Sequence, residues 1–234
     1  MKKDRKYDLG LMVKGKKTDF INMQIRRITM PLTRFIAKHT DITPNQISVS
    51  NLFLMILAVL ALGISGYTNH AYEIRLIGSI IVFLTTILDH VDGKLARVKR
   101  ITSLFGKWLD DVPALIFVPF TLFSLALGLN NPRLMPIGAL AMLCFPMQFL
   151  LIYYFKAEFQ SKAKGNIDVV KKDNKLRYVY GTVYLYVLLP LACIFNQPHL
   201  ILWFFAIFGN LFWIVVMFLQ LFALIKQKKQ SDFK

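Results

Sequence analysis

The sequence predicts an all-α integral membrane protein, with six transmembrane helices preceded by an N-terminal interfacial amphipathic helix. Hydrophobic residues make up 56% of the 234 residues and charged residues only 18%, which is more apolar than an ordinary soluble domain. Apolar runs of about twenty residues recur, the length that a helix needs to cross a bilayer. Because lipid satisfies no backbone polar group, these runs must be helical.

The six expected spans are separated by linkers of two kinds. Three linkers, "GYTNHAYE", "NNP" and "NQPH", are short enough to act as simple turns. The spans lie near residues 47–66, 74–96, 108–128, 134–155, 177–196 and 200–225. The chain is therefore divided into a basic N-terminal segment (1–19), a juxtamembrane amphipathic helix and linker (20–45), a six-helix domain (46–226) and a basic cytosolic tail (227–234).

Positive charge follows this division closely. The net charge is +16, and 27 of the 29 Lys and Arg residues lie before the first span, in the 94–107 and 156–177 linkers, or between Lys226 and the C-terminus. The other three linkers hold only Arg75 and Arg133. The positive-inside rule then places both termini and the basic linkers in the cytosol. We therefore expect the basic side to face anionic lipid headgroups rather than nucleic acid.

The segment before the first span has the pattern of a surface helix. Within residues 20–38, "FINMQIRRITMPLTRFIAK", apolar and basic residues separate on the helical wheel, which is typical of an interfacial helix. A soluble helix packed on the membrane domain is the alternative. Thr43 is expected to cap a helix whose first turn takes Pro44 and which continues into the first span.

Acidic residues are concentrated around the second and third spans. A charged residue inside a membrane segment is costly and marks a functional site by default. At helical spacing one face carries two carboxylates, two small residues and a cation, namely Asp89, Asp92, Gly93, Ala96 and Arg97. The small residues leave room for a neighbouring helix or for a ligand close to the backbone.

Asp110 is expected to begin the next helix, after a turn over residues 98–109 that contains Gly106. The two helices should lie side by side, so that their carboxylates converge. Close carboxylates repel one another unless a cation lies among them. An all-oxygen ligand set favours Mg²⁺ or Mn²⁺, and two such ions could hold a transferring phosphate. The bland alternative is a buried ion pair of Asp89 or Asp92 with Lys94 or Arg97.

This pattern resembles the motif D-x2-D-G-x2-A-R-x8-G-x3-D-x3-D of the CDP-alcohol phosphatidyltransferase family. Seven fixed positions match at the stated spacings, and the eighth, residue 114, is alanine instead of aspartate. The resemblance extends over most of the chain, because the family has six transmembrane helices, cytosolic termini, an amphipathic N-terminal helix and a Pro-Asn pair, here Pro44 and Asn45. The family is also often dimeric, so a homodimer is expected.

The resemblance implies a displacement at phosphorus. A CDP-linked donor, either CDP-diacylglycerol or a small CDP-alcohol, would lose CMP while an alcohol or alcohol-phosphate acceptor takes the substituted phosphate. It implies that the metal ligands are Asp89, Asp92 and Asp110. It also implies a CDP site formed by Asp89, Asp92, Gly93, Ala96, Arg97 and Asn45. The hydrophobic setting suggests that at least one substrate is a membrane lipid.

Ala114 stands where the family has its general base, and four explanations are open. In the first, a neighbouring group such as Asp111 or His90 replaces the base. The expected catalytic residues are then Asp110, Asp111 and Arg97. Alternatively the acceptor is already ionised, the alanine is a deliberate change, or the chain is a member that only binds nucleotide. A cation transporter is a distant alternative. The acids of a transporter would be spread across the depth of the membrane, whereas those of this chain lie at one boundary. The acceptor is not identified by the sequence.

Overall fold

The structure is a computed structural model that describes residues 20–160 and 182–231. All regular secondary structure within these two ranges is helical, in agreement with the predicted fold class. The basic segment 1–19, the start of the fifth expected span at 177–181, and residues 232–234 of the tail lie outside the described residues. Predictions for those segments therefore remain predictions.

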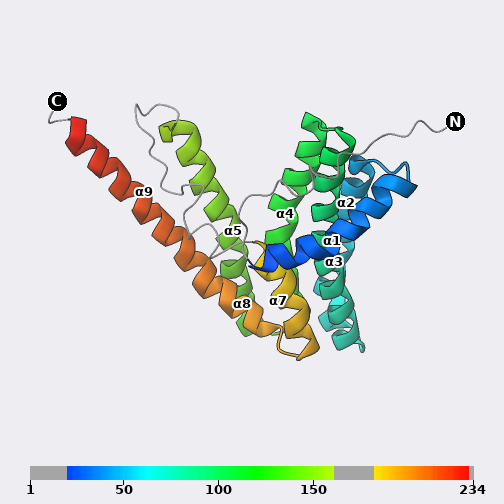
Figure 1. Cartoon of the computed structure of the whole chain (residues 1–234). Helices are drawn as coiled ribbons and strands as arrows, with labels where there is room; N and C mark the ends of the chain where they lie inside the picture. The colour runs from blue at the N-terminus through cyan, green and yellow to red at the C-terminus, as the bar shows by residue number, and fades with distance from the viewer. Residues whose placement is uncertain (1–19, 161–181, 232–234) are drawn as a thin grey trace.

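Eight α-helices account for most of the described chain (Figure 1). They are α1 (Phe20–His39), α2 (Pro44–Ile64), α3 (Ala71–Lys99), α4 (Leu104–Gly128), α5 (Met135–Phe155), α7 (Thr182–Ile194), α8 (His199–Phe204) and α9 (Asn210–Ser231). Short 3-10 turns cover Ser65–Tyr67 and Pro132–Leu134. One π-helical turn, Lys156–Gln160, extends α5, and another, Phe205–Gly209, joins α8 to α9.

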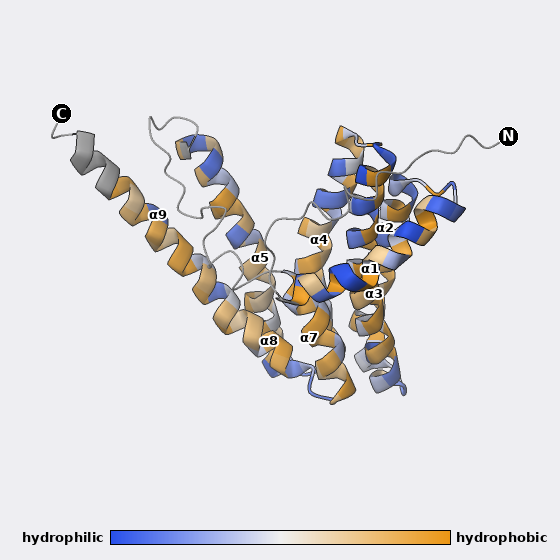
Figure 2. Cartoon of the chain, in the orientation of Figure 1, coloured by the Kyte–Doolittle hydropathy of each residue, from blue (hydrophilic) through white to orange (hydrophobic). Residues whose placement is uncertain are grey.

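Five helical stretches of the described residues are long and apolar enough to cross a membrane. Their bounds are Pro44–Tyr67, Ala71–Lys99, Leu104–Gly128, Pro132–Phe159 and His199–Ile225, which correspond to five of the six expected spans. The fifth expected span overlaps α7, an apolar helix of 13 residues that is shorter than these five stretches. Figure 2 shows the same helices as mainly hydrophobic along their length, with hydrophilic residues collected at the helix ends and on α1.

Helix α2 begins as the sequence predicts. The Thr43 hydroxyl accepts a hydrogen bond from the backbone N–H of Gln46, and the Gln46 side chain accepts one from the N–H of Thr43, 2.8 Å away. This reciprocal pair satisfies two amide groups that a helix start leaves without partners. Pro44 occupies the first turn, where it has no amide hydrogen to lose. The start of α2 is therefore fixed at one residue. This start determines the direction in which each later side chain of α2 points.

The expectation that α3 and α4 lie side by side is wrong for most of their length. Helix α2 packs extensively against both, whereas α3 and α4 touch each other at only a few positions. The close α2–α4 approach depends on Gly128, because a Cβ there would overlap the carbonyl oxygen of Leu62. In Figure 1, α5 and α9 lean away from α2, α3 and α4. Helix α2 is therefore the element that brings the two acidic helices into register.

The turn between α3 and α4 is also shorter than the expected 98–109. Helix α3 runs on to Lys99 and ends at Arg100, whose left-handed backbone (φ 54°) lets its N–H reach the carbonyl oxygens of Ala96 and Arg97. Helix α4 starts at Leu104, because the Ser103 hydroxyl accepts a hydrogen bond from the N–H of Gly106. Asp110 thus lies inside α4 and not at its first residue.

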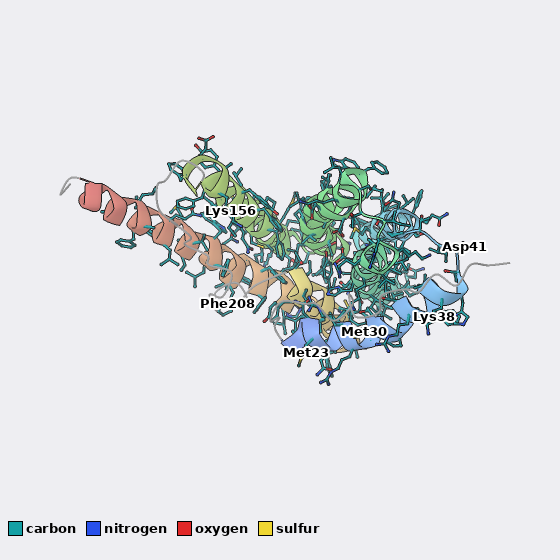
Figure 3. All side chains as sticks on the ribbon, turned by 45° about the horizontal axis from the view of Figure 1, so that its top comes forward. Met23, Met30, Lys38, Asp41, Lys156 and Phe208 are labelled. Atoms are coloured by element: carbon teal, nitrogen blue, oxygen red, sulfur yellow. The ribbon has the colours of Figure 1, made fainter. Side chains whose placement is uncertain are left out.

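Helix α1 covers residues 20–38, where the sequence predicts an amphipathic helix, and its position at the membrane interface stays a prediction. Figure 3 shows it running crosswise to the other helices from Met23 to Lys38. Its inward face, which packs against α3, is formed by residues spaced four apart, namely Ile25, Thr29, Thr33 and Ala37. Met30 and Ile36 are partly buried beside this face. Other apolar side chains of α1 point away from the protein: Ile28 is 55% exposed and Phe35 is 59% exposed.

Candidate functional site

Three carboxylates meet where α3 and α4 come closest. One oxygen atom of each of Asp89, Asp92 and Asp110 lies within 4.8 Å of the others. Asp89 and Asp92 come from one face of α3, as their spacing predicts, and Asp110 comes from α4. Asp92 is 4% exposed, whereas Asp110 is exposed. The cluster therefore has a buried side and an open side.

Helix α2 supplies the partner of Asp92. The Ser48 hydroxyl donates a hydrogen bond to Asp92 Oδ2 at 2.7 Å, and Ser48 itself is buried. The second oxygen, Asp92 Oδ1, is buried and has no hydrogen-bond partner among the described residues. A buried carboxylate oxygen without a donor is costly. It points to a bound cation or proton at this position.

A cavity of about 510 Å³ opens beside the carboxylates. Its volume is that of an ordinary small-molecule site. Its walls come from the start of α2, the end of α3, the 100–103 turn and the start of α4. The predicted site residues that line it are Asn45, Asp92, Gly93, Ala96, Arg97 and Asp110. Ser48 and Lys107 line it as well, so a second cation besides Arg97 faces the cavity.

The two glycines of the motif serve different purposes. A Cβ on Gly93 would meet only Arg97 Nη1, at 3.7 Å, so its backbone faces open space and not a neighbouring helix. A Cβ on Gly106 would lie 2.9 Å from Asn45 Oδ1 and 3.1 Å from Ser103 Oγ. Gly106 therefore lets α4 approach α2, whereas Gly93 leaves room for a ligand.

Lys94 and His90 point to the other side of α3, toward α1. The buried Lys94 ammonium donates hydrogen bonds to the Thr29 hydroxyl and to the carbonyl oxygen of Arg26. His90 Nδ1 lies 2.9 Å from the carbonyl oxygen of Thr86, and Nε2 lies 3.1 Å from Asn22 Oδ1. Nδ1 must carry a hydrogen to bond a carbonyl oxygen. Both ring nitrogens of His90 thus have partners, which is typical of a residue with a structural role.

The ion-pair alternative is not what this face shows. Within the described residues, none of the three aspartates pairs with Lys94 or Arg97. His90 Nδ1 lies 3.8 Å from Asp89 Oδ2. Arg97 is exposed at the cavity wall. The cations of the motif are thus either turned to α1 or free to meet an anionic ligand.

Two residues at the end of the motif lie outside this arrangement. Asp111 is exposed and lines neither the cavity nor the carboxylate cluster. Ala114 is half-buried, one helical turn beyond Asp110. Ser48 was missed by the sequence reasoning. The available signal was a polar stripe at spacing three on α2, Asn45, Ser48 and Asn51, at the start of an otherwise apolar span.

The donor set fits a hard divalent cation. All three clustered side chains offer oxygen, which Mg²⁺ and Mn²⁺ prefer. Asp92 Oδ1 has no competing hydrogen bond in the described part of the chain. Three like charges at this distance are also unfavourable without a positive charge among them. These residues are therefore suited to holding one or two such ions.

Comparison with known proteins identifies the class of this site. The family model "CDP-alcohol phosphatidyltransferase" matches residues 41–222, and the chain belongs to this family. A relative from Aquifex aeolicus (strain VF5), named "Bifunctional IPC transferase and DIPP synthase", is 28% identical over 113 residues. That match covers 48% of this chain and 24% of the relative, so this chain corresponds to only part of the longer protein.

Proposed function

We propose that the protein is a membrane phosphotransferase that moves a substituted phosphate from a CDP-linked donor to an acceptor hydroxyl and releases CMP. The observation that carries this proposal is the convergence of Asp89, Asp92 and Asp110, of which Asp92 and Asp110 line a cavity large enough for a nucleotide. Membership of the CDP-alcohol phosphatidyltransferase family supports the reaction class. Phospholipid or related lipid biosynthesis is the setting that this class implies.

The proposed reaction is a balanced displacement at phosphorus. The acceptor oxygen bonds to the phosphorus that bears the donor alcohol, while the bond in the pyrophosphate bridge breaks and its electron pair leaves with CMP. The acceptor proton passes to a base. Mg²⁺ or Mn²⁺, as one or two ions held by the three aspartates, would supply the charge stabilisation that such transfers need.

The other cavity residues have separate roles in this proposal. Gly93 and Ala96 admit the flat cytidine close to the α3 backbone, because little side-chain bulk stands there. Asn45 limits the cavity from α2, and Asp89 and Asp92 join the nucleotide site through its phosphates and metal. Arg97 supplies the positive charge for the phosphates. Lys107, which lines the same cavity, is available to the second phosphate-bearing substrate.

We also propose the placement of the protein in the membrane. The exposed apolar side chains of α1, Ile28 and Phe35, alternate with the exposed Arg27 and Arg34, which suits a helix lying at the lipid–water interface. With six spans, the termini and the active site would then face the cytosol, where the basic linkers are concentrated. A lipid donor or acceptor would reach the cavity from that interface, and a homodimer is expected from the family.

Ala114 supports a second candidate, a member that binds CDP-linked ligands and turns them over slowly or not at all. Asp111 is our candidate for the missing base, because it is the acid nearest to residue 114 on the same helix that is not in the metal cluster. It is exposed outside the cavity, so it would act on an acceptor arriving from that side. The two candidates share the CDP site and differ only in turnover.

The binding half of the proposal is tested by thermal unfolding of the purified chain in detergent, with CDP or CDP-diacylglycerol and with or without Mg²⁺. We expect the melting temperature to rise with nucleotide only when Mg²⁺ is present, because the proposed site binds the phosphates through the metal. A ligand at 100 times its Kd stabilises the folded state by about 2.7 kcal/mol. No metal-dependent rise would rule out the transferase and the CDP-binding candidate together.

The turnover half is tested by CMP release from the wild type, Asp111→Asn and Ala114→Asp. If Asp111 is the base, Asp111→Asn lowers CMP release by about 10²–10⁴-fold and leaves CDP binding unchanged. If the chain is an impaired member, the wild type is inactive and Ala114→Asp restores CMP release. A wild type that is active and insensitive to both changes favours an acceptor that is already ionised.

A further inference from the structure

Asn51 is a buried polar residue on α2 that the motif does not include. It is 5% exposed, and its Oδ1 atom is buried without a hydrogen-bond partner in the described part of the chain. An unpaired amide oxygen in a membrane-spanning helix is unfavourable. A residue retained at such a cost calls for a ligand that satisfies it.

The surroundings of Asn51 identify the kind of ligand. A second space, too narrow to admit a water molecule, adjoins the nucleotide-sized cavity and shares Ser48, Asp92 and Asp110 with it. It is lined by all three clustered aspartates together with Ser48 and Asn51. The rest of its lining is apolar: Leu52, Met55, Leu109 and Pro113. Two buried oxygens, Asn51 Oδ1 and Asp92 Oδ1, thus belong to residues of one cavity, and neither has a donor.

The one hydroxyl in this cavity is already committed. Ser48 donates its hydrogen to Asp92 Oδ2 at 2.7 Å, so it is not available to Asp92 Oδ1 or to Asn51. A cavity with several oxygen acceptors, no remaining side-chain donor from another residue and three carboxylates is suited to a cation. An amide oxygen is a ligand that hard cations accept alongside carboxylates.

We infer that Asn51 Oδ1 is an additional oxygen ligand of the divalent cation held by Asp89, Asp92 and Asp110. This inference rests on the proposed function, because it concerns the same metal centre. It assigns a ligand to α2, the helix that packs against both acidic helices. It also gives the centre a fourth protein side chain in a chain whose motif lacks the aspartate at residue 114.

The test is Mn²⁺ binding to the purified full-length chain in detergent, followed by the electron paramagnetic resonance signal of free Mn²⁺ and without any substrate. The variants are Asn51→Leu, which removes the oxygen at similar volume, and Asn51→Asp, which keeps it and adds charge. The matched control is Gln148→Leu on α5, because Gln148 Oε1 is also buried without a partner but lines neither the small cavity nor the nucleotide-sized one. Thermal unfolding of each variant checks that it is folded.

We expect Asn51→Leu to weaken Mn²⁺ binding by about 10–100-fold, the range known for groups that support a metal site. Asn51→Asp should bind at least as tightly as the wild type, and Gln148→Leu should bind like the wild type. Wild-type affinity in Asn51→Leu would overturn the inference and leave the proposed function intact. Weaker Mn²⁺ binding in Asn51→Asp than in Asn51→Leu would also overturn it. That result would mean that the wild-type Asn51 side-chain N–H donates a hydrogen bond to Asp92, and that its oxygen does not bind the cation. Absence of Mn²⁺ binding by the wild type would refute the metal centre itself.

Discussion

The two sides of α3 treat their polar groups in opposite ways. On the side facing α1, Lys94 and His90 are hydrogen-bonded to Thr29, Asn22 and backbone carbonyls. On the side facing α2 and α4, Asp92 Oδ1 is buried and has no hydrogen-bond partner within residues 20–160 and 182–231. Both sides belong to the same helix, within one stretch of about two turns. We therefore interpret Lys94 and His90 as residues that complete the fold, and Asp92 as the residue that we propose binds a ligand.

Space follows the same division. The α1 side is closed by Val91, Leu95 and Val98, which are 0%, 0% and 3% exposed and form a small core with Ala37 and Ile47. The other side opens at Gly93 to a cavity of about 510 Å³. Protein interiors are normally close-packed, so an open face on a helix inside the bundle is not explained by packing alone. Substitutions on the open side should therefore change ligand binding, and those on the closed side should change stability.

The largest effect on ligand binding is expected from Asp92→Asn. It removes a charged ligand from the cluster, so Mg²⁺ affinity should fall by more than the roughly 10–100-fold seen for supporting residues. The metal-free protein should be at least as stable as the wild type, because one of three repelling carboxylates is gone. Thermal unfolding with and without Mg²⁺ and CDP measures both. Undiminished Mg²⁺-dependent stabilisation would show that this side, too, is structural.

A slightly smaller effect is expected from Gly93→Ala. The added methyl group enters the cavity and should weaken CDP binding by about 10–200-fold, the range for one methylene in a fitted site. The free protein should become more stable by about 0.5–1 kcal/mol, because alanine is the better helix residue and its Cβ meets nothing closer than 3.7 Å. Isothermal titration with CDP and Mg²⁺, and thermal unfolding of the free protein, check the two parts.

Gly128→Ala is the matched control for that prediction. Its Cβ would overlap the carbonyl oxygen of Leu62, so the helices must move apart. We expect a loss of about 1–3 kcal/mol in stability, typical of overpacking, and unchanged affinity for CDP in the protein that remains folded. If both glycine variants lost stability, the face of α3 at Gly93 would be a packing face.

Ser48→Ala should give an intermediate effect. It removes the hydrogen bond to Asp92 Oδ2 and frees that carboxylate to rotate. Because groups that orient a metal ligand contribute about 10–100-fold to metal affinity, we expect a loss near the lower end of that range. Mn²⁺ titration measures it, and Ser48→Thr, which keeps the hydroxyl, should restore most of the affinity. A Thr variant as weak as the Ala variant would mean that packing, not the hydrogen bond, is responsible.

The smallest effect on binding is expected from Lys94→Ala, although it lies only two residues from Asp92. It breaks hydrogen bonds to Thr29 and Arg26 and should lower the unfolding free energy by about 1–3 kcal/mol. Its affinity for Mg²⁺ and CDP should stay at the wild-type value. Thermal unfolding and CDP titration decide the matter. Weakened CDP binding at unchanged stability would break the division between the two sides.

Much of this arrangement could be predicted from the sequence. The spacing of Asp89, Asp92 and Gly93 fixes them on one face, because helical periodicity does not depend on the neighbours of the helix. Five expected spans are matched by helices of sufficient length and apolarity, and Thr43 caps α2 as predicted. The family was also recognisable from the sequence, because its motif occupies one continuous stretch of the chain, from Asp89 to Ala114.

The errors concern relations between helices. The turn before α4 is confined to residues 100–103, because Ser103 caps α4 three residues before Gly106. The expected α3–α4 contact is largely replaced by contacts of each with α2. Asp111, expected as a catalytic residue, is exposed beyond the cavity, and its role remains a prediction. No local pattern reports which neighbour a helical face will meet.

The sequence alone was enough to predict the apolar helical class, the helical face that carries Asp89 and Asp92, and the family of the chain, because each depends on composition or on spacing along the chain. Only the tertiary structure decided that Ser48 and Asn51 adjoin the acids, that Lys94 turns to α1 and that Gly93 faces open space. Ser48 and Asp92 are 44 residues apart in the chain, and their contact depends on the crossing of two helices. Such a crossing is set by packing over the whole interface, to which no single residue is a guide.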